Sequence, residues 1–238
     1  MAVAHDAAAE SHTGTTGSAS EASFAWTHAP AGTPRGVLVF TFVNANADDA
    51  TAVSYGASSM TAVTGGRAVD TAGEAGDCKA WFLGSSVPTG NQTVTVTRTN
   101  NANVMYAVSI TVTAAADTEI KGTPVLLQGD QVVAEQAVDS GADAALRYAG
   151  LNTGLLNEPG AGASSTFLLG IDFGIRTIGT VVETTGGTGS RNVGFSVVIE
   201  DTAAVHLAIG EVAAAGGRIF ALAGEGGGLV GARRGLAG

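Results

Sequence analysis

Hydrophobic and small polar residues alternate along much of the chain. Residues 92–99 read Gln-Thr-Val-Thr-Val-Thr-Arg-Thr, and residues 104–113 read Val-Met-Tyr-Ala-Val-Ser-Ile-Thr-Val-Thr. Successive side chains of a β-strand point to opposite faces of its sheet, so this two-residue period predicts strands. The valine face packs on a core, and the threonine face meets water, another sheet or another subunit.

About a dozen short strands are predicted in this way, with turn-forming residues between them. Glycine, proline, asparagine and aspartate gather between the apolar runs at intervals of about ten residues. The predicted strands are 23–28, 36–43, 52–55, 60–63, 79–83, 92–99, 104–113, 125–134, 144–148, 166–172, 177–182, 194–199 and 205–211.

One segment, 203–215, also fits a helix, because alanine favours helix and Gly216 with Gly217 would end it. Val205, Leu207 and Ile209 alternate with other residues, which favours a strand instead.

This pattern predicts an all-β protein. An open parallel sheet would need crossover helices, and the spacing of the turns is typical of an antiparallel two-sheet β-sandwich of jelly-roll form. The predicted organisation is a flexible N-terminal arm (1–22), a sandwich domain (23–222) and a glycine-rich C-terminal tail (223–238). A subdivision near 115–124 is an open alternative.

Composition adds limits on partners and location. With 238 residues, 45% of them hydrophobic, the chain can bury a sizeable core. Its net charge of −10 disfavours binding to nucleic acid, because phosphate backbones would be repelled. The N-terminus lacks the pattern of a secretion signal and no stretch has the length of a membrane span, so we expect a soluble chain made in the cytoplasm, with no membrane partner. The single Cys78 is expected to be a buried structural thiol.

Motifs for catalysis are absent or out of context. Residues 226–231 match a dinucleotide-binding pattern, but too few residues follow for a phosphate-binding helix. Residues 172–174 read Asp-Phe-Gly without the other kinase motifs, and no serine lies in a nucleophile elbow. The four histidines are scattered without metal-ligand spacing: His5, His12, His28 and His206. The sequence therefore predicts no catalytic, cofactor-binding or metal site, and no enzyme.

Acidic loops and aromatic residues are the remaining candidates for a binding site. Carboxylates on adjoining loops can bind calcium, although turn preference explains them more simply. These carboxylates are Asp48, Asp49, Asp70, Glu74 and Asp77. Three aromatic residues offer faces for sugar stacking, although core packing is the favoured interpretation: Trp26, Tyr55 and Trp81.

The chain resembles a recurring β-sandwich module of bacteriophage virion proteins and of some bacterial surface proteins. The resemblance covers roughly residues 20–211 and is most specific in the first half. It rests on strand and turn residues: 35–43, 53–56 with 60–61, 80–83, Pro88, Gly90 and 94–97. It brings no catalytic residues with it, so it implies a structural role.

Two hypotheses of function remain. The first is a non-enzymatic phage structural protein, part of the capsid as a decoration or minor protein or part of the tail, which stabilises the particle or presents a surface to the host. It implies a homo-oligomer, contacts with other virion proteins and a location in virions assembled in the host cytoplasm. The alternative is a carbohydrate-binding or adhesive module that binds a host-surface glycan through its loops.

Overall fold

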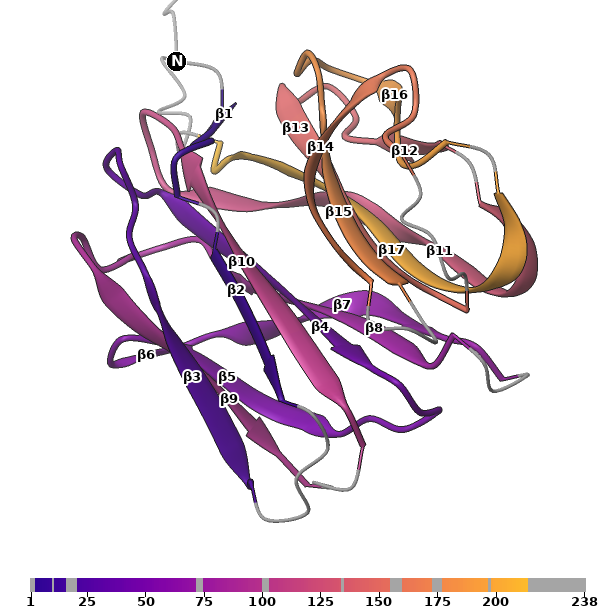
Figure 1. The fold of residues 1–238 in the computed structure, drawn as a ribbon. Coiled ribbons are helices and arrows are strands. Elements are labelled where there is room, and N and C mark those ends of the chain that lie inside the picture. The colour runs from indigo at the N-terminus through magenta and orange to yellow at the C-terminus, as the bar shows by residue number, and fades with distance from the viewer. Residues whose placement is uncertain are drawn as a thin grey trace, which may run out of the picture.

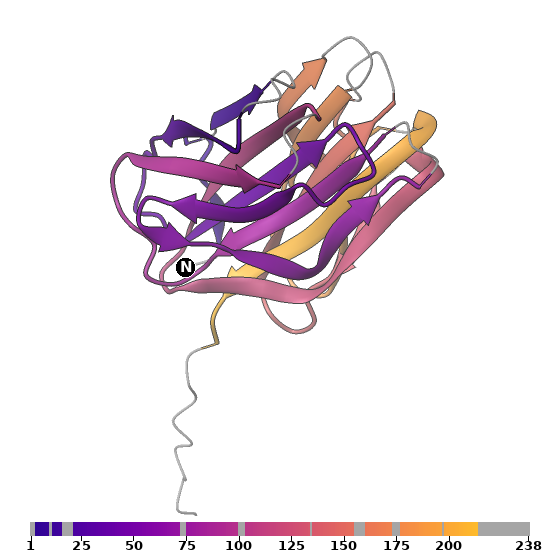
Figure 2. The ribbon, with the colours of Figure 1, turned by 90° about the horizontal axis from the view of Figure 1, so that it is seen from below.

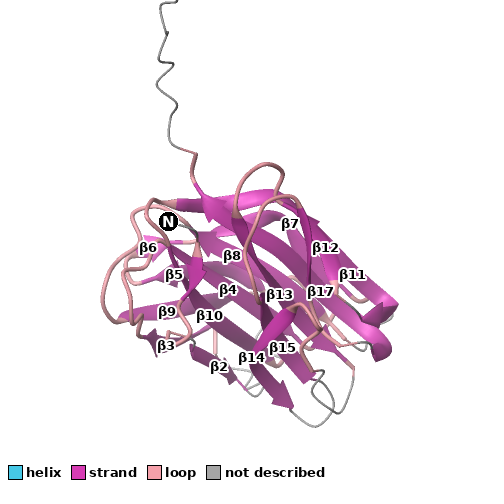
Figure 3. Ribbon diagram, turned by 90° about the horizontal axis from the view of Figure 1, so that it is seen from above, coloured by secondary structure: helices cyan, strands magenta, loops and turns pink. Residues whose placement is uncertain are grey.

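A computed structural model describes residues 3–9, 11–15, 21–71, 75–99, 103–133, 135–154, 160–172, 177–196 and 198–213. The regular structure of these residues is β-strand throughout, and their strands pair antiparallel (Figures 1, 2 and 3). The prediction of an all-β antiparallel sandwich is confirmed, and the expected strand 205–211 lies within the longer strand Val198–Glu211. The jelly-roll form stays a prediction.

The strands form four sheets. The first outer sheet has the order β3 (Ser23–His28), β9 (Gln92–Arg98), β5 (Ala50–Tyr55) and β6 (Ser58–Ser59). The first inner sheet has the order β10 (Met105–Thr113), β4 (Gly36–Val43), β8 (Asp77–Leu83) and β7 (Thr61–Val69), and both β1 (Ala4–His5) and β2 (Ser11–Thr15) pair with β10.

The second half of the chain builds the other two sheets. The second inner sheet has the order β11 (Thr118–Val133), β17 (Val198–Glu211), β13 (Ala145–Thr153), β15 (Thr177–Glu183) and β14 (Ser165–Asp172). The second outer sheet consists of β12 (Gln136–Asp139) and β16 (Ser190–Val193). Figure 1 shows the early strands in indigo and magenta on one side and the late strands in orange and yellow on the other.

Strand β4 explains why there are more layers than the two expected. All eight of its residues are buried. Val37 and Val39 face the first outer sheet, whereas Leu38 and Phe40 belong to the apolar cluster between the two inner sheets. A strand that is buried on both faces needs a sheet on each side, so the near-continuous apolar sequence of β4 indicates a central position.

Three apolar clusters hold the layers together. One lies between the first outer and first inner sheets and includes Tyr55 and Trp81. The largest joins the two inner sheets and includes Tyr148 and Leu207. The third lies between the second inner and second outer sheets around Phe195. Because the largest cluster connects strands from both halves, the halves pack as one body.

The N-terminal segment differs from its prediction as a flexible arm. Residues 4–5 and 11–15 pair with the edge of β10, and Val3 and Ala9 are buried. Backbone hydrogen bonds to an open sheet edge do not require large apolar side chains, so composition alone missed this pairing.

Several other elements also differ from prediction. Strands β6, β12 and β16 were not predicted, and the expected strand 194–199 is interrupted between β16 and β17. Residues 218–222 and 223–238 lie outside the described residues.

Candidate docking groove and ionisable groups

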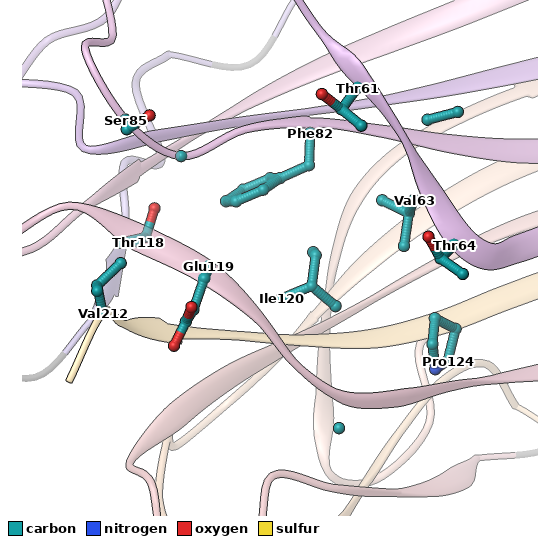
Figure 4. Close-up of a pocket in the computed structure, with 13 residues that line it drawn as sticks. Thr61, Val63, Thr64, Phe82, Ser85, Thr118, Glu119, Ile120, Pro124 and Val212 are labelled. Carbon is teal, nitrogen blue, oxygen red and sulfur yellow. The ribbon is translucent and has the colours of Figure 1, made fainter.

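A groove lies between the edge strands of the two inner sheets and is here called the edge groove. It has a volume of about 510 Å³. Strand β7 and the end of β8 form one wall, and the start of β11 forms the other, with the end of β17 at one mouth (Figure 4). Its lining residues are Thr61, Ala62, Val63, Thr64, Phe82, Gly84, Ser85, Thr118, Glu119, Ile120, Gly122, Pro124 and Val212.

The groove exists because β7 separates from its neighbour. The pairing of β7 with β8 is interrupted between Ala62 and Arg67, and Gly65 adopts a left-handed φ of 68°. At this irregularity β7 bends and does not pair regularly with β8. Among the described strands, β7 and β11 each end their sheet, so both present an edge beside the groove.

Close backbone contact joins the two walls at one end of the groove. The backbone N–H of Thr118 donates to the carbonyl of Gly84 at 2.8 Å, and the Thr118 hydroxyl donates to the carbonyl of Arg35 at 2.6 Å. A side chain at position 84 would meet the Thr118 carbonyl oxygen at 1.9 Å. Glycine is therefore required where β11 begins against the first inner sheet.

The floor of the groove is apolar and its rim is polar. Phe82, Val63 and Ile120 point toward the same space, with Glu119 at the rim (Figure 4). Val212 at the mouth is 41% exposed, and it is the one exposed large hydrophobic residue among those whose burial the structure describes. Glu119 accepts a hydrogen bond from Lys121 at 2.6 Å. Such a groove is suited to binding an extended apolar segment.

Two of the acidic loop residues, Asp48 and Asp77, belong to a compact charge cluster with Arg67 and Lys79. Arg67 donates to the buried Asp77 at 2.5 Å, and Lys79 donates to Asp48 at 2.8 Å. Lys79 also lies over the ring of Trp81, 4.5 Å from its centroid, a cation–π contact. Burial raises the pKa of Asp77 to about 7, and the Arg67 guanidinium offsets part of this rise. The cluster closes one end of β7 and β8.

Asp77→Asn is expected to change how stability depends on pH. The folded protein holds its Asp77 proton up to about pH 7, whereas the unfolded chain loses it near 3.8. The stabilising contribution of Asp77 to the free energy of unfolding is therefore fully present below about pH 4 and is lost as pH rises through about 7. Relative to wild type, the variant should gain on the order of 3 kcal/mol in free energy of unfolding between about pH 4 and pH 8, measured by urea unfolding.

Two internal comparisons make this prediction specific. Burial lowers the pKa of His28 and of His206 to about 4, so their contributions are lost as pH falls from about 6.5 to about 4. Both histidines remain in the variant, and their effect cancels in the difference. Arg67→Gln should shift the loss of the Asp77 contribution to higher pH, because the substitution removes a cation that lowers the pKa of Asp77. Parallel pH curves for wild type and Asp77→Asn would contradict the assignment.

The other acidic candidates are used by the backbone and by neighbouring side chains. Asp70 is buried and accepts a hydrogen bond from the backbone N–H of Ala75 at 2.8 Å. Asp49 is buried and accepts one from the side-chain amide of Asn103 at 2.7 Å. Glu74 lies outside the described residues. The structure does not bring these carboxylates together: no group of three metal-ligating side chains occurs within the described ranges.

The histidines and the cysteine occupy structural positions where their side chains are described. The His28 ring lies between two hydroxyls of β10, with Nδ1 2.7 Å from Ser109 Oγ and Nε2 2.5 Å from Thr111 Oγ1. All three residues are buried. His206 is also buried, with Nδ1 3.3 Å from the Val125 carbonyl oxygen.

The remaining members of this set lie on three different strands. Cys78 is fully buried, which raises the pKa of its thiol well above the ordinary value. His5 lies on β1 with its ring edge toward Tyr148, and His12 lies on β2.

The aromatic residues considered for sugar stacking pack into the sandwich. Tyr55 and Trp81 are buried, and Trp81 donates to the hydroxyl of Thr41 at 3.2 Å. Trp26 is half-buried, stacks against Phe24, and donates to Ser109 at 3.0 Å. Their packing follows the favoured interpretation, in which aromatics bury large areas between sheets.

Sequence reasoning missed a buried ion network in the second half. Arg147 is fully buried, and its guanidinium donates to Glu183 at 3.1 Å and to the hydroxyl of Ser140 at 2.8 Å. Arg191 bonds the other oxygen of Glu183. Four backbone carbonyls complete the shell around Arg147: Val138, Ala145, Gly187 and Gly189. The apolar run that surrounds Arg147 in β13 is the signal that could have predicted its burial.

Comparison with known proteins gave no match among protein-family models, curated proteins or solved structures. Within the described part of the chain, no helix long and apolar enough to cross a membrane is found.

Proposed function

We propose that the protein is a non-enzymatic structural subunit of a bacteriophage particle, in the capsid or the tail, and that it acts by binding copies of itself and other virion proteins. The observation that carries the proposal is the edge groove. It combines an apolar floor, an exposed Val212 at its mouth and two neighbouring edge strands, and these are features of a surface that binds another chain.

The ionisable groups support a structural role. Two charge clusters link neighbouring strands: Arg67 with Asp77 at β7 and β8, and Arg147 with Glu183 at β13 and β15. Each buried carboxylate in these pairs faces a guanidinium, an arrangement that holds the backbone in place. The sequence resemblance to virion sandwich modules adds the phage context.

The proposal predicts a defined oligomer of the whole chain in solution, measured by multi-angle light scattering. Val63→Asp places a charge on the floor of the groove, where its desolvation would weaken the contact at least tenfold. Thr51→Asp on β5 adds the same charge at an exposed position away from the groove and should leave the mass unchanged. Circular dichroism checks that both variants are folded.

A whole chain that stays monomeric at all concentrations, and that binds neither capsid nor tail components, would contradict the proposal. If Val63→Asp and Thr51→Asp changed the mass equally, the groove would not be the contact surface. A chain that instead bound glycans through residues near Asp48 would support the alternative hypothesis of a carbohydrate-binding module.

A further inference from the structure

We propose that the edge groove is occupied by the C-terminal segment 218–222 of a neighbouring copy of this chain. This inference rests on the proposed function, because it names the contact that would join the subunits. The segment reads Arg-Ile-Phe-Ala-Leu, so it brings three large apolar side chains to an apolar floor.

The position where the described chain ends directs attention to this segment. Strand β17 runs to Glu211, which pairs with Thr118 at the start of β11. Val212 then lines the mouth of the groove and directly precedes Ala213, the last described residue. The 25 residues that follow begin beside the groove, and their first cluster of large apolar residues is 219–222.

The direction of β17 favours a neighbouring copy over the same chain. Strand β17 passes antiparallel to β11 and leaves the sheet at the Thr118 end. To bring segment 218–222 to the groove of its own chain, the chain would have to reverse direction. A two-residue turn at Gly216 and Gly217, which glycine favours, would place residue 222 beside residue 211. The apolar residues would then reach only the near end of the groove.

The far end of the groove would stay uncovered in that arrangement. From Thr118 to Pro124 the β11 wall covers six steps of strand, roughly 20 Å at about 3.3 Å per residue. Beyond residue 222 the sequence reads Ala-Gly-Glu-Gly-Gly-Gly, which has no large apolar side chain for Val63 and Pro124. A segment from another copy can instead lie along the whole groove with Phe220 over its centre.

Charge is complementary between the segment and the groove. The tail 214–238 contains three arginines and one glutamate, within a chain whose net charge is −10. Arg218 comes directly before the apolar cluster, and Glu119 lies exposed at the rim of the groove. A cation beside this carboxylate would set the direction in which the segment enters.

The test is disulfide cross-linking between two full-length chains that differ in size by a tag. One carries Thr64→Cys, an exposed position at the Pro124 end of the groove (Figure 4), and the other carries Ala223→Cys at the end of the segment. The native Cys78 is buried and stays in both. We expect the mixed disulfide to form at least tenfold faster than with Thr51→Cys, which is exposed on the first outer sheet. A synthetic peptide of residues 214–224 should suppress it.

Three results would overturn the inference. The first is a mixed disulfide that forms no faster than with the Thr51→Cys control, and the second is no suppression by the peptide. The third is a disulfide formed only within one chain when that chain carries both Thr64→Cys and Ala223→Cys. Light scattering of the same proteins separates the two proposals. An oligomer without this cross-link would leave the structural role standing with a different contact, whereas a monomer that also binds neither capsid nor tail components would remove the proposed function itself.

Discussion

Arg147→Met is expected to destabilise the protein by about 3–5 kcal/mol, a large part of the stability of an ordinary domain. Arg147 is fully buried, and its guanidinium satisfies one carboxylate, one hydroxyl and four backbone carbonyls. Methionine fills a similar volume but donates nothing, so Glu183 keeps its charge in the interior with Arg191 alone. Urea unfolding at pH 7 measures the loss.

Arg191→Met is the matched control for this experiment. Arg191 bonds the same Glu183, but its side chain is 37% exposed, so water replaces much of what is lost. We expect Arg191→Met to lower the free energy of unfolding by about 1 kcal/mol. Arg147→Lys tests geometry, because an ammonium group cannot reach all the acceptors of a guanidinium and should recover only part of the stability. Equal effects of Arg147→Met and Arg191→Met would show that the buried network contributes little.

Gly84→Ala is expected to lower the free energy of unfolding by about 3 kcal/mol, although replacing glycine by alanine normally stabilises an exposed loop. The added Cβ would lie 1.9 Å from the Thr118 carbonyl oxygen and 2.5 Å from Cε1 of Phe82. Relief requires β11 to move away from the first inner sheet, which would break the Thr118 to Gly84 hydrogen bond. The expected result is a lower melting temperature together with a more exposed Phe82.

Gly160→Ala is the control, since the Cβ there would have Ser196 Oγ at 3.4 Å as its nearest neighbour and is tolerated sterically. Gly160→Ala should change the free energy of unfolding by no more than about 0.5 kcal/mol. A Gly84→Ala variant as stable as Gly160→Ala would mean that the contact between Gly84 and Thr118 is not close in solution.

Strand positions were predictable from sequence because alternation is a local property. Strands β3 and β4 match their predicted bounds, and β10 differs by one residue at its start. Short strands such as β12 and β16 were missed because four residues carry too little periodicity. The pairing of 11–15 with β10 was also missed, since backbone hydrogen bonds leave little trace in composition.

The candidate site was much less predictable than the strands. Asp48 and Asp77 were noted as loop carboxylates, but their partners Arg67 and Lys79 come from strands β7 and β8 that only pair in the folded chain. The edge groove combines residues from 61–64, 82–85, 118–124 and 212. None of these segments is unusual by itself, so no local pattern indicates a groove.

The sequence by itself determined that this protein is built of antiparallel strands, because the alternation of valine and threonine leaves the chain few other ways to bury its apolar residues. It also favoured core positions for Tyr55 and Trp81, and both are buried. The tertiary structure alone decided the four-layer stacking, the burial of Arg147 and the position of the edge groove. These depend on contacts between residues far apart in the chain, where distance and desolvation, rather than local periodicity, determine which groups meet.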